Sequence, residues 1–103
     1  MDLKNYKTYK DVLSMAHKRG LESLVTQILQ YPDKENGGHC IVQATAQFKD
    51  IEGKWSDIGD AMPGNVNKMI APHLVRMAST RAKGRTLRDA MNFGDPIAEE
   101  LDV

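Results

Sequence analysis

The fold is decided by one segment, residues 62–92, MPGNVNKMIAPHLVRMASTRAKGRTLRDAMN, which we predict to form nearly one continuous helix. Pro63 suits the first helical position, because its missing N–H would have no partner there. Gly94 follows the other end, where a residue in the left-handed conformation can stop a helix. A single stripe runs along this helix in steps of four and three residues. It consists of Ile70, Leu74, Met77, Arg81, Gly84, Arg88 and Met91.

The chemistry of this stripe changes halfway along it. Its first half is apolar and fits a core, whereas its second half contains Arg81, Gly84 and Arg88. A helix of about 30 residues is about 45 Å long, whereas a strand of about 6–8 residues covers about 20–27 Å. We therefore expect the helix to extend beyond its own sheet, with the arginine-rich half meeting a different partner. Pro72 can kink the helix. Gly84 lowers the stability of a helix by about 1 kcal/mol relative to alanine. A glycine at this position is explained if another backbone comes close.

The composition is that of an ordinary globular domain. The chain has 103 residues, of which 41% are hydrophobic and 27% are charged, and this length favours a single domain. No apolar run approaches the roughly 18 residues of a membrane-spanning helix, and the amino terminus lacks the apolar stretch of a signal peptide. Cys40 is the only cysteine. A disulfide framework is therefore excluded, and we expect a cytoplasmic protein.

The charges are balanced in total but separated along the chain. The 14 basic and 14 acidic side chains give a formal net charge of zero. From residue 95 onwards every charged side chain is acidic, and we expect residues 95–103 to form a flexible acidic tail after a single domain, residues 1–94. The preceding helix is either a solvated surface or a site for an anionic partner. Its charged residues from 65 to 88 are all basic: Lys68, Arg76, Arg81, Lys83, Arg85 and Arg88.

The rest of the chain contains one more helix and three strands. Residues 8–19 carry apolar residues at helical spacing, begin with a capping pair, Thr8 and Asp11, and are followed by Gly20. The cleanest strand is residues 39–49, in which apolar and polar residues largely alternate. The other predicted strands are residues 22–31 and 54–59.

These elements predict an α+β domain with the order α-β-β-β-α. Short connections favour antiparallel neighbours, and hence a three-stranded antiparallel meander. Ala44 and Ala46 leave room for a helix on one face of the sheet. We therefore expect the long carboxy-terminal helix to cover that face, with the short amino-terminal helix beside it. Gly59, near the end of the third strand, indicates a bulge or a close backbone approach.

No group of residues indicates catalysis or a metal site. His39 and Cys40 are the only adjacent histidine and cysteine, and zinc requires three or four ligands. Asp57 and Asp60 could hold magnesium, but such residues more often cap a helix or satisfy turn amides. We therefore expect neither an enzyme nor a cofactor, and we expect no metal.

Two segments resemble a known class of protein. Residues 53–66, GKWSDIGDAMPGNV, and residues 76–90, RMASTRAKGRTLRDA, are similar to the hairpin and helix of single-strand annealing proteins. That class includes the phage Erf-type proteins and the eukaryotic annealing recombinases, and the likeness covers roughly residues 40–93. Most of the chain is also similar to small uncharacterised bacterial proteins with a Gly-Asp-Ala-Ser-Pro turn before an arginine- and alanine-rich helix.

In annealing proteins the hairpin and helix build oligomeric rings that hold single-stranded DNA by its backbone. The resemblance therefore implies a homo-oligomer that binds single-stranded DNA in recombination or repair. At the matching positions, Lys83, Arg85 and Arg88 would contact phosphates. The resemblance also includes Arg76 or Arg81 among the contacts, and each contact would increase the salt dependence of binding.

Two other functions are compatible with the same pattern. The helix could pair with a second copy or with another protein, and its arginines would then bridge carboxylates, including those of the acidic tail. The order α-β-β-β-α is also that of double-stranded-RNA-binding domains, which read RNA shape with a basic helix start and loops. The basic residues here lie late in the helix, which disfavours the RNA hypothesis, and fold analogy alone does not establish function.

Overall fold

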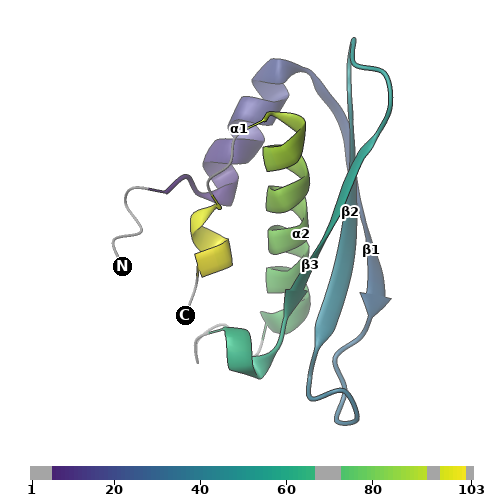
Figure 1. Ribbon diagram of the computed structural model, residues 1–103, viewed down its shortest axis with the longest axis vertical. Helices are drawn as coiled ribbons and strands as arrows, with labels where there is room; N and C mark the ends of the chain where they lie inside the picture. Colours follow the sequence, from purple (N-terminus) through teal and green to yellow (C-terminus); the bar gives the residue numbers. More distant parts are fainter. Residues whose placement is uncertain (1–5, 67–72, 93–95, 102–103) are drawn as a thin grey trace.

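The computed structural model describes residues 6–66, 73–92 and 96–101. Figure 1 shows two layers, a three-stranded sheet and a helical layer in which α2 lies along the sheet with α1 beside it. The strands follow the order β1-β2-β3 and all neighbours are antiparallel, so the predicted meander and the α+β class are confirmed. The elements in chain order are α1 (Tyr9–Arg19), β1 (Leu21–Gln30), β2 (Cys40–Phe48), β3 (Trp55–Ala61), the 3-10 helix η2 (Pro63–Asn65), α2 (Leu74–Ala90) and the 3-10 helix η4 (Ala98–Leu101).

The two ends of α1 are as predicted. Thr8 is the N-cap: its hydroxyl accepts the N–H of Asp11, and the Asp11 carboxylate accepts the N–H of Thr8, which completes a capping box. Gly20 ends the helix with φ +105°, a conformation that a residue without a Cβ adopts at little cost. The chain therefore turns directly from α1 into β1.

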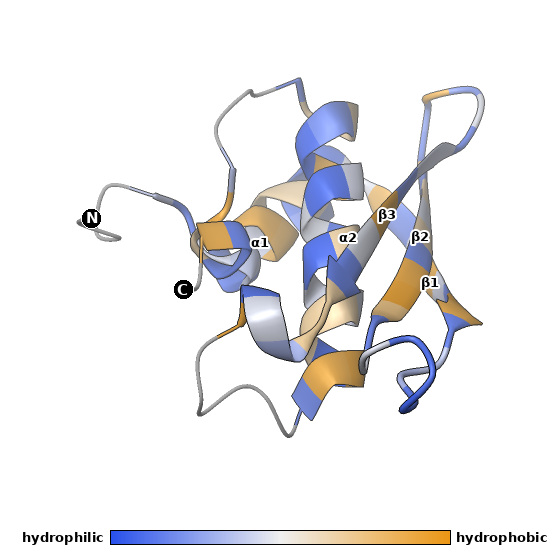
Figure 2. Ribbon diagram, turned by 60° about the horizontal axis from the view of Figure 1, so that its bottom comes forward, coloured by the Kyte–Doolittle hydropathy of each residue, from blue (hydrophilic) through white to orange (hydrophobic). Residues whose placement is uncertain are grey.

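β2 lies in the middle of the sheet and carries the core. Its inward residues are buried, and α2 packs on β2 and β3 while touching β1 little. Most turns of α2 are coloured as hydrophilic in Figure 2, and its buried residues include both small and large side chains, such as Ala78, Ala82 and Leu87. The buried residues of β2 are Cys40, Val42, Ala44, Ala46 and Phe48.

The backbone of α2 approaches the sheet closely at Gly59. A Cβ at this position would lie 2.7 Å from the carbonyl carbon of Arg81 and 2.8 Å from the carbonyl oxygen of Ala78. Both atoms belong to the backbone of α2, so they cannot rotate away. The predicted close backbone approach at Gly59 is confirmed.

The predicted single helix over residues 62–92 is wrong. Pro63–Asn65 form only the short helix η2, Val66 is extended with φ −134°, and α2 begins at Leu74. The 17 residues of α2 make it about 25 Å long, so its length matches the sheet and the expected overhang does not form.

One local hydrogen bond and one core contact explain why the helix does not start at Pro63. The side-chain oxygen of Asn65 accepts the N–H of Met62, which closes a single turn, and the side chain of Val66 enters the core. The predicted kink at Pro72 and the predicted stop at Gly94 lie outside the described residues. After α2 the chain reaches a left-handed conformation at Asn92, with φ +58°.

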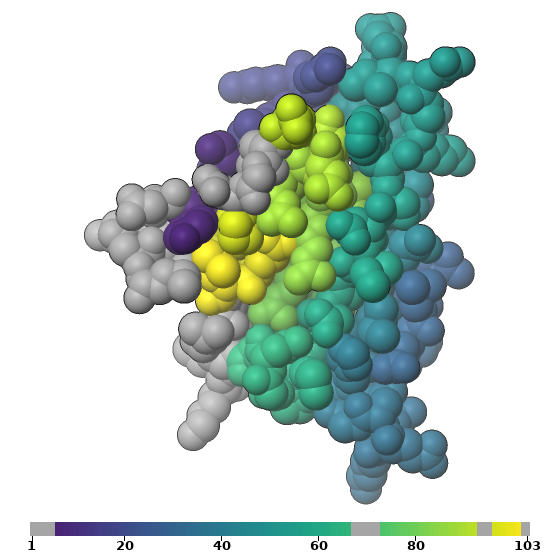
Figure 3. All heavy atoms as spheres, viewed as in Figure 1, coloured from purple at the N-terminus to yellow at the C-terminus, as the bar shows by residue number. Residues whose placement is uncertain are grey.

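Residues 96–101, expected to belong to a flexible tail, are packed against α2. Ile97 is fully buried and occupies the space beside Gly84, where a Cβ would collide with its side chain. The Ala98 N–H donates to the carbonyl of Lys7 (2.8 Å), and the Glu99 carboxylate accepts the N–H of Tyr9 (2.9 Å). Figure 3 shows this segment, in yellow, between α2 and the purple amino-terminal residues.

Candidate nucleic-acid interface

Arg81 is a buried residue that joins three parts of the chain. Its side chain is only 4% exposed, and its guanidinium donates to the carbonyl oxygens of Asp60 (3.0 Å), Asn65 (2.9 Å) and Glu99 (3.1 Å). A second bond reaches the side-chain oxygen of Asn65. These bonds tie β3, η2 and η4 to α2, so Arg81 has a structural role in this arrangement.

Arg85 and Arg88 share one carboxylate of the carboxy-terminal segment. Arg85 Nε lies 2.9 Å from Glu100 Oε1, and Arg88 Nη1 lies 3.2 Å from Glu100 Oε2. The Glu100 side chain is only 6% exposed and also accepts the N–H of Ile97. The bridging of helix arginines to the chain's own acidic residues, one of the alternatives above, is therefore present for Arg85 and Arg88.

The five predicted basic residues consequently divide into two groups. Arg81, Arg85 and Arg88 face the carboxy-terminal segment and are engaged there. Arg76 and Lys83 line a groove of about 590 Å³ along α2, and Arg76 also lines an adjoining pocket with Glu99. We call the groove the α2 groove, and its lining residues are Pro32, His73, Leu74, Val75, Arg76, Ser79, Thr80 and Lys83.

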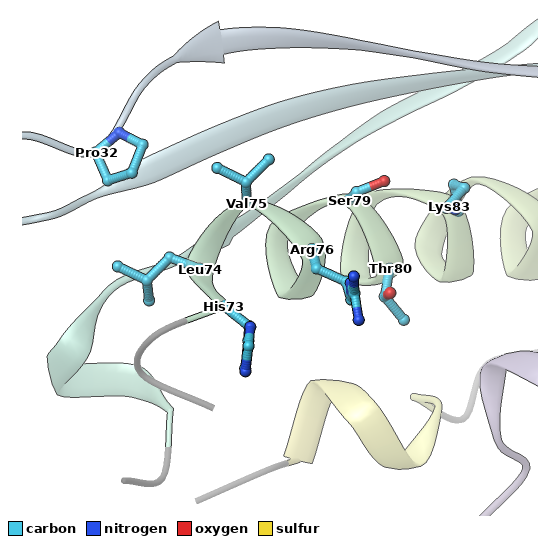
Figure 4. Close-up of a pocket in the computed structure, with 8 residues that line it drawn as sticks. All are labelled: Pro32, His73, Leu74, Val75, Arg76, Ser79, Thr80 and Lys83. Carbon is cyan, nitrogen blue, oxygen red and sulfur yellow. The ribbon is translucent and has the colours of Figure 1, made fainter. Parts of the chain in front are cut away.

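The α2 groove combines cations, hydroxyls and an apolar wall. Figure 4 shows that Val75 projects towards the strands, whereas Arg76 and Thr80 project away from them. Lys83 lies seven positions after Arg76, which corresponds to about two helical turns or about 10 Å. No lining residue of the groove is acidic, so an anion placed there would meet attraction from both cations.

Tyr9 of α1 lies beside Lys83 of α2. The ammonium group of Lys83 lies 5.0 Å from the centre of the Tyr9 ring, within the range of a cation–π contact. Partial burial raises the pKa of the Tyr9 phenol. Lys83 therefore lines the α2 groove while its ammonium group contacts Tyr9, which lines the adjoining pockets and not the groove itself.

The residues considered for metal binding do not converge. Asp57 and Asp60 lie on opposite faces of β3, because three positions separate them along a strand. Asp57 accepts the N–H of Ile58 (2.7 Å), and Asp60 lies 2.7 Å from His39 Nε2. Cys40 is buried, which raises the pKa of its thiol. Among the described residues, no group of three or more potential ligands could hold a metal ion.

The polar residues that surround the two groove cations were not predicted from the sequence. His73, Ser79 and Thr80 line the same groove as Arg76 and Lys83. Their signal was available, because positions 76, 79, 80 and 83 recur at helical spacing on one flank of α2. The neighbouring stripe of α2 contains more arginines, and the prediction of a binding surface was based on those arginines.

Comparison with known proteins adds no relative to this description. No family model matches the chain, and neither a curated protein nor a solved structure does. The resemblance to annealing proteins therefore stays a prediction. In the part of the chain that the structure describes, no helix has the length and apolar character needed to cross a bilayer.

Proposed function

We propose that the protein binds single-stranded nucleic acid without catalysing a reaction, and that the α2 groove receives the sugar–phosphate backbone. The observation that carries this proposal is a groove that contains Arg76 and Lys83 and no carboxylate. Phosphate contacts supply most of the affinity in binding that does not depend on sequence. The hydroxyl groups of Ser79 and Thr80 are further donors that a phosphate can accept from.

An exposed aromatic residue, Tyr31, is the chain neighbour of a residue that lines the groove. Tyr31 follows β1, is 68% exposed, and precedes Pro32, which lines the groove. Aromatic side chains beside a basic groove stack the bases of single strands, and this stacking tolerates any sequence. The combination of Tyr31 with the two cations favours a single strand over a duplex, whose bases are already stacked.

The test is a fluorescence anisotropy titration of the protein with a labelled single-stranded oligonucleotide at about 50 mM and about 200 mM salt. Two phosphate contacts predict a slope of about −1.4 for the logarithm of the association constant against the logarithm of salt. The Arg76→Glu/Lys83→Glu variant should bind roughly tenfold more weakly or worse and lose this slope.

A charge-matched control separates the groove from net charge. Lys49→Glu/Lys54→Glu changes two exposed lysines at the β2–β3 connection and should bind like the unchanged protein. Equal loss in both variants, or no binding at low salt, would refute the proposal. Parallel titrations with duplex DNA and duplex RNA decide the alternative, since tighter binding to a duplex would also contradict it.

A further inference from the structure

The two edge strands of the sheet, β1 and β3, differ in whether side chains bond to their outward-facing backbone groups. At the β3 edge, the Ile58 N–H donates to the Asp57 carboxylate, and the Ile58 carbonyl accepts from Arg85 Nη1 (3.1 Å). The carbonyl of Asp60 accepts from Arg81 Nη1 (3.0 Å). Side chains therefore occupy backbone groups along the β3 edge that another strand would need.

The same bonds show which backbone groups of β1 point outward. The N–H and C=O of Ile58 both point away from β2. Its partner on β2, Gln43, therefore does not bond to Ile58 and directs its own N–H and C=O to β1. On β1, Gln43 pairs with Gln27. Gln27 is then bonded inward, and its neighbours along the strand alternate with it. The residues whose N–H and C=O face the open edge of β1 are Leu24, Thr26 and Ile28.

The side chains of β1 do not protect this edge. From residue 23 to residue 31 the chain has no charged residue and no proline, although edge strands usually carry one or the other to prevent pairing. Val25 is 60% and Leu29 is 50% exposed. Irregularities at residues 21–23 and 28–30 leave a regular segment between them, with Thr26 near its middle.

We propose that β1 pairs with β1 of a second copy of this chain, antiparallel, about a twofold axis at Thr26. This register places Thr26 opposite its own equivalent and Leu24 opposite Ile28 of the second copy, so the three outward residues of each strand form about six backbone hydrogen bonds. The pairing buries Leu24 and Ile28, which are only partly buried now. Since β3 is occupied, each copy offers one edge, and the assembly closes at two copies.

The experiment measures molar mass by light scattering in high salt without nucleic acid, so its result is independent of the proposed function. The unchanged protein should have twice the 11.5 kDa mass of one chain. Thr26→Lys places two like charges opposite each other at the axis and should give a folded monomer. Gln47→Lys, on the outer face of β2 away from this edge, is the matched control and should stay dimeric.

A cysteine substitution tests the register. Directly opposed residues in a hydrogen-bonded pair have Cα atoms about 5.5 Å apart, which suits a disulfide. Thr26→Cys should therefore cross-link two chains on oxidation, and Gln27→Cys should not. A monomer at all concentrations, a mass that grows beyond two chains, or a dimer that survives Thr26→Lys would each overturn the proposal.

Discussion

Gly59 determines how closely α2 can approach the sheet. A Cβ there would press on backbone atoms of Ala78, Arg81 and Ala82, none of which can rotate away. We expect Gly59→Ala to lower the free energy of unfolding by about 3 kcal/mol, because β3 and α2 must separate to admit the methyl group. Urea denaturation measures this change.

A second glycine supplies the control for that substitution. A Cβ at Gly64 would meet nothing within 4 Å, so Gly64→Ala should change the free energy of unfolding by less than about 0.5 kcal/mol. Equal stability of the two variants would mean that α2 does not rest on Gly59.

Arg81 shows what a sequence pattern cannot reveal about one residue. Its position in the helical stripe was predictable, but its partners are carbonyl groups of residues 60, 65 and 99. Every residue has a carbonyl, so these acceptors leave no mark in the sequence. An arginine on a polar helix was therefore interpreted as a surface cation, although it is one of the most buried charged side chains described.

At the scale of the element, the start of α1 should respond to acid. The Thr8 N–H donates to the Asp11 carboxylate (3.0 Å), and this bond lowers the pKa of Asp11 below its ordinary value of 3.8. A carboxylate with a lower pKa in the folded state stabilises the fold above its ordinary pKa, and this contribution is lost as the pH falls through the folded-state value. Stability from this cap is therefore present at neutral pH.

The expected outcome is a pH-dependent difference between Asp11→Asn and the unchanged protein. Asparagine cannot ionise, so the variant should melt at a lower temperature at neutral pH, and the two melting temperatures should converge below about pH 4. Thermal unfolding followed by circular dichroism over a pH series measures the difference. A gap of constant size down to acid pH would show that the ionised carboxylate contributes nothing.

The elements differ in how well the sequence predicted them. β2 was predictable because its apolar and polar residues alternate, and this alternation indicates which side chains face the core. α1 was predictable because its end signals are local: Thr8 and Asp11 cap its first turn, and Gly20 ends its last turn. The start of α2 was not, since Val66 is extended in order to fill a core made by distant residues. Of the five predicted binding residues, Arg76 and Lys83 line one groove, whereas Arg81, Arg85 and Arg88 bond to other parts of the chain.

At the scale of the whole molecule, the carboxy-terminal segment is part of the domain. A chain that ends at residue 94 lacks the buried Ile97 and the carboxylate of Glu100 that joins Arg85 and Arg88. We expect this truncation to lower the free energy of unfolding by about 4 kcal/mol, mostly through the cavity left by Ile97. A chain that ends at residue 101 keeps these contacts and is the control. Urea denaturation would contradict the prediction if both truncations were equally stable.

The contact between the two ends of the described chain has a consequence for biosynthesis. Residue 98 bonds to residue 7, and residue 99 bonds to residues 9 and 81. A ribosome delivers residue 7 long before residue 98, so the sheet and α2 emerge while the guanidinium of Arg81 still lacks one of its acceptors. Co-translational folding can therefore begin with the meander, but the native state closes only after residue 100 has left the exit tunnel.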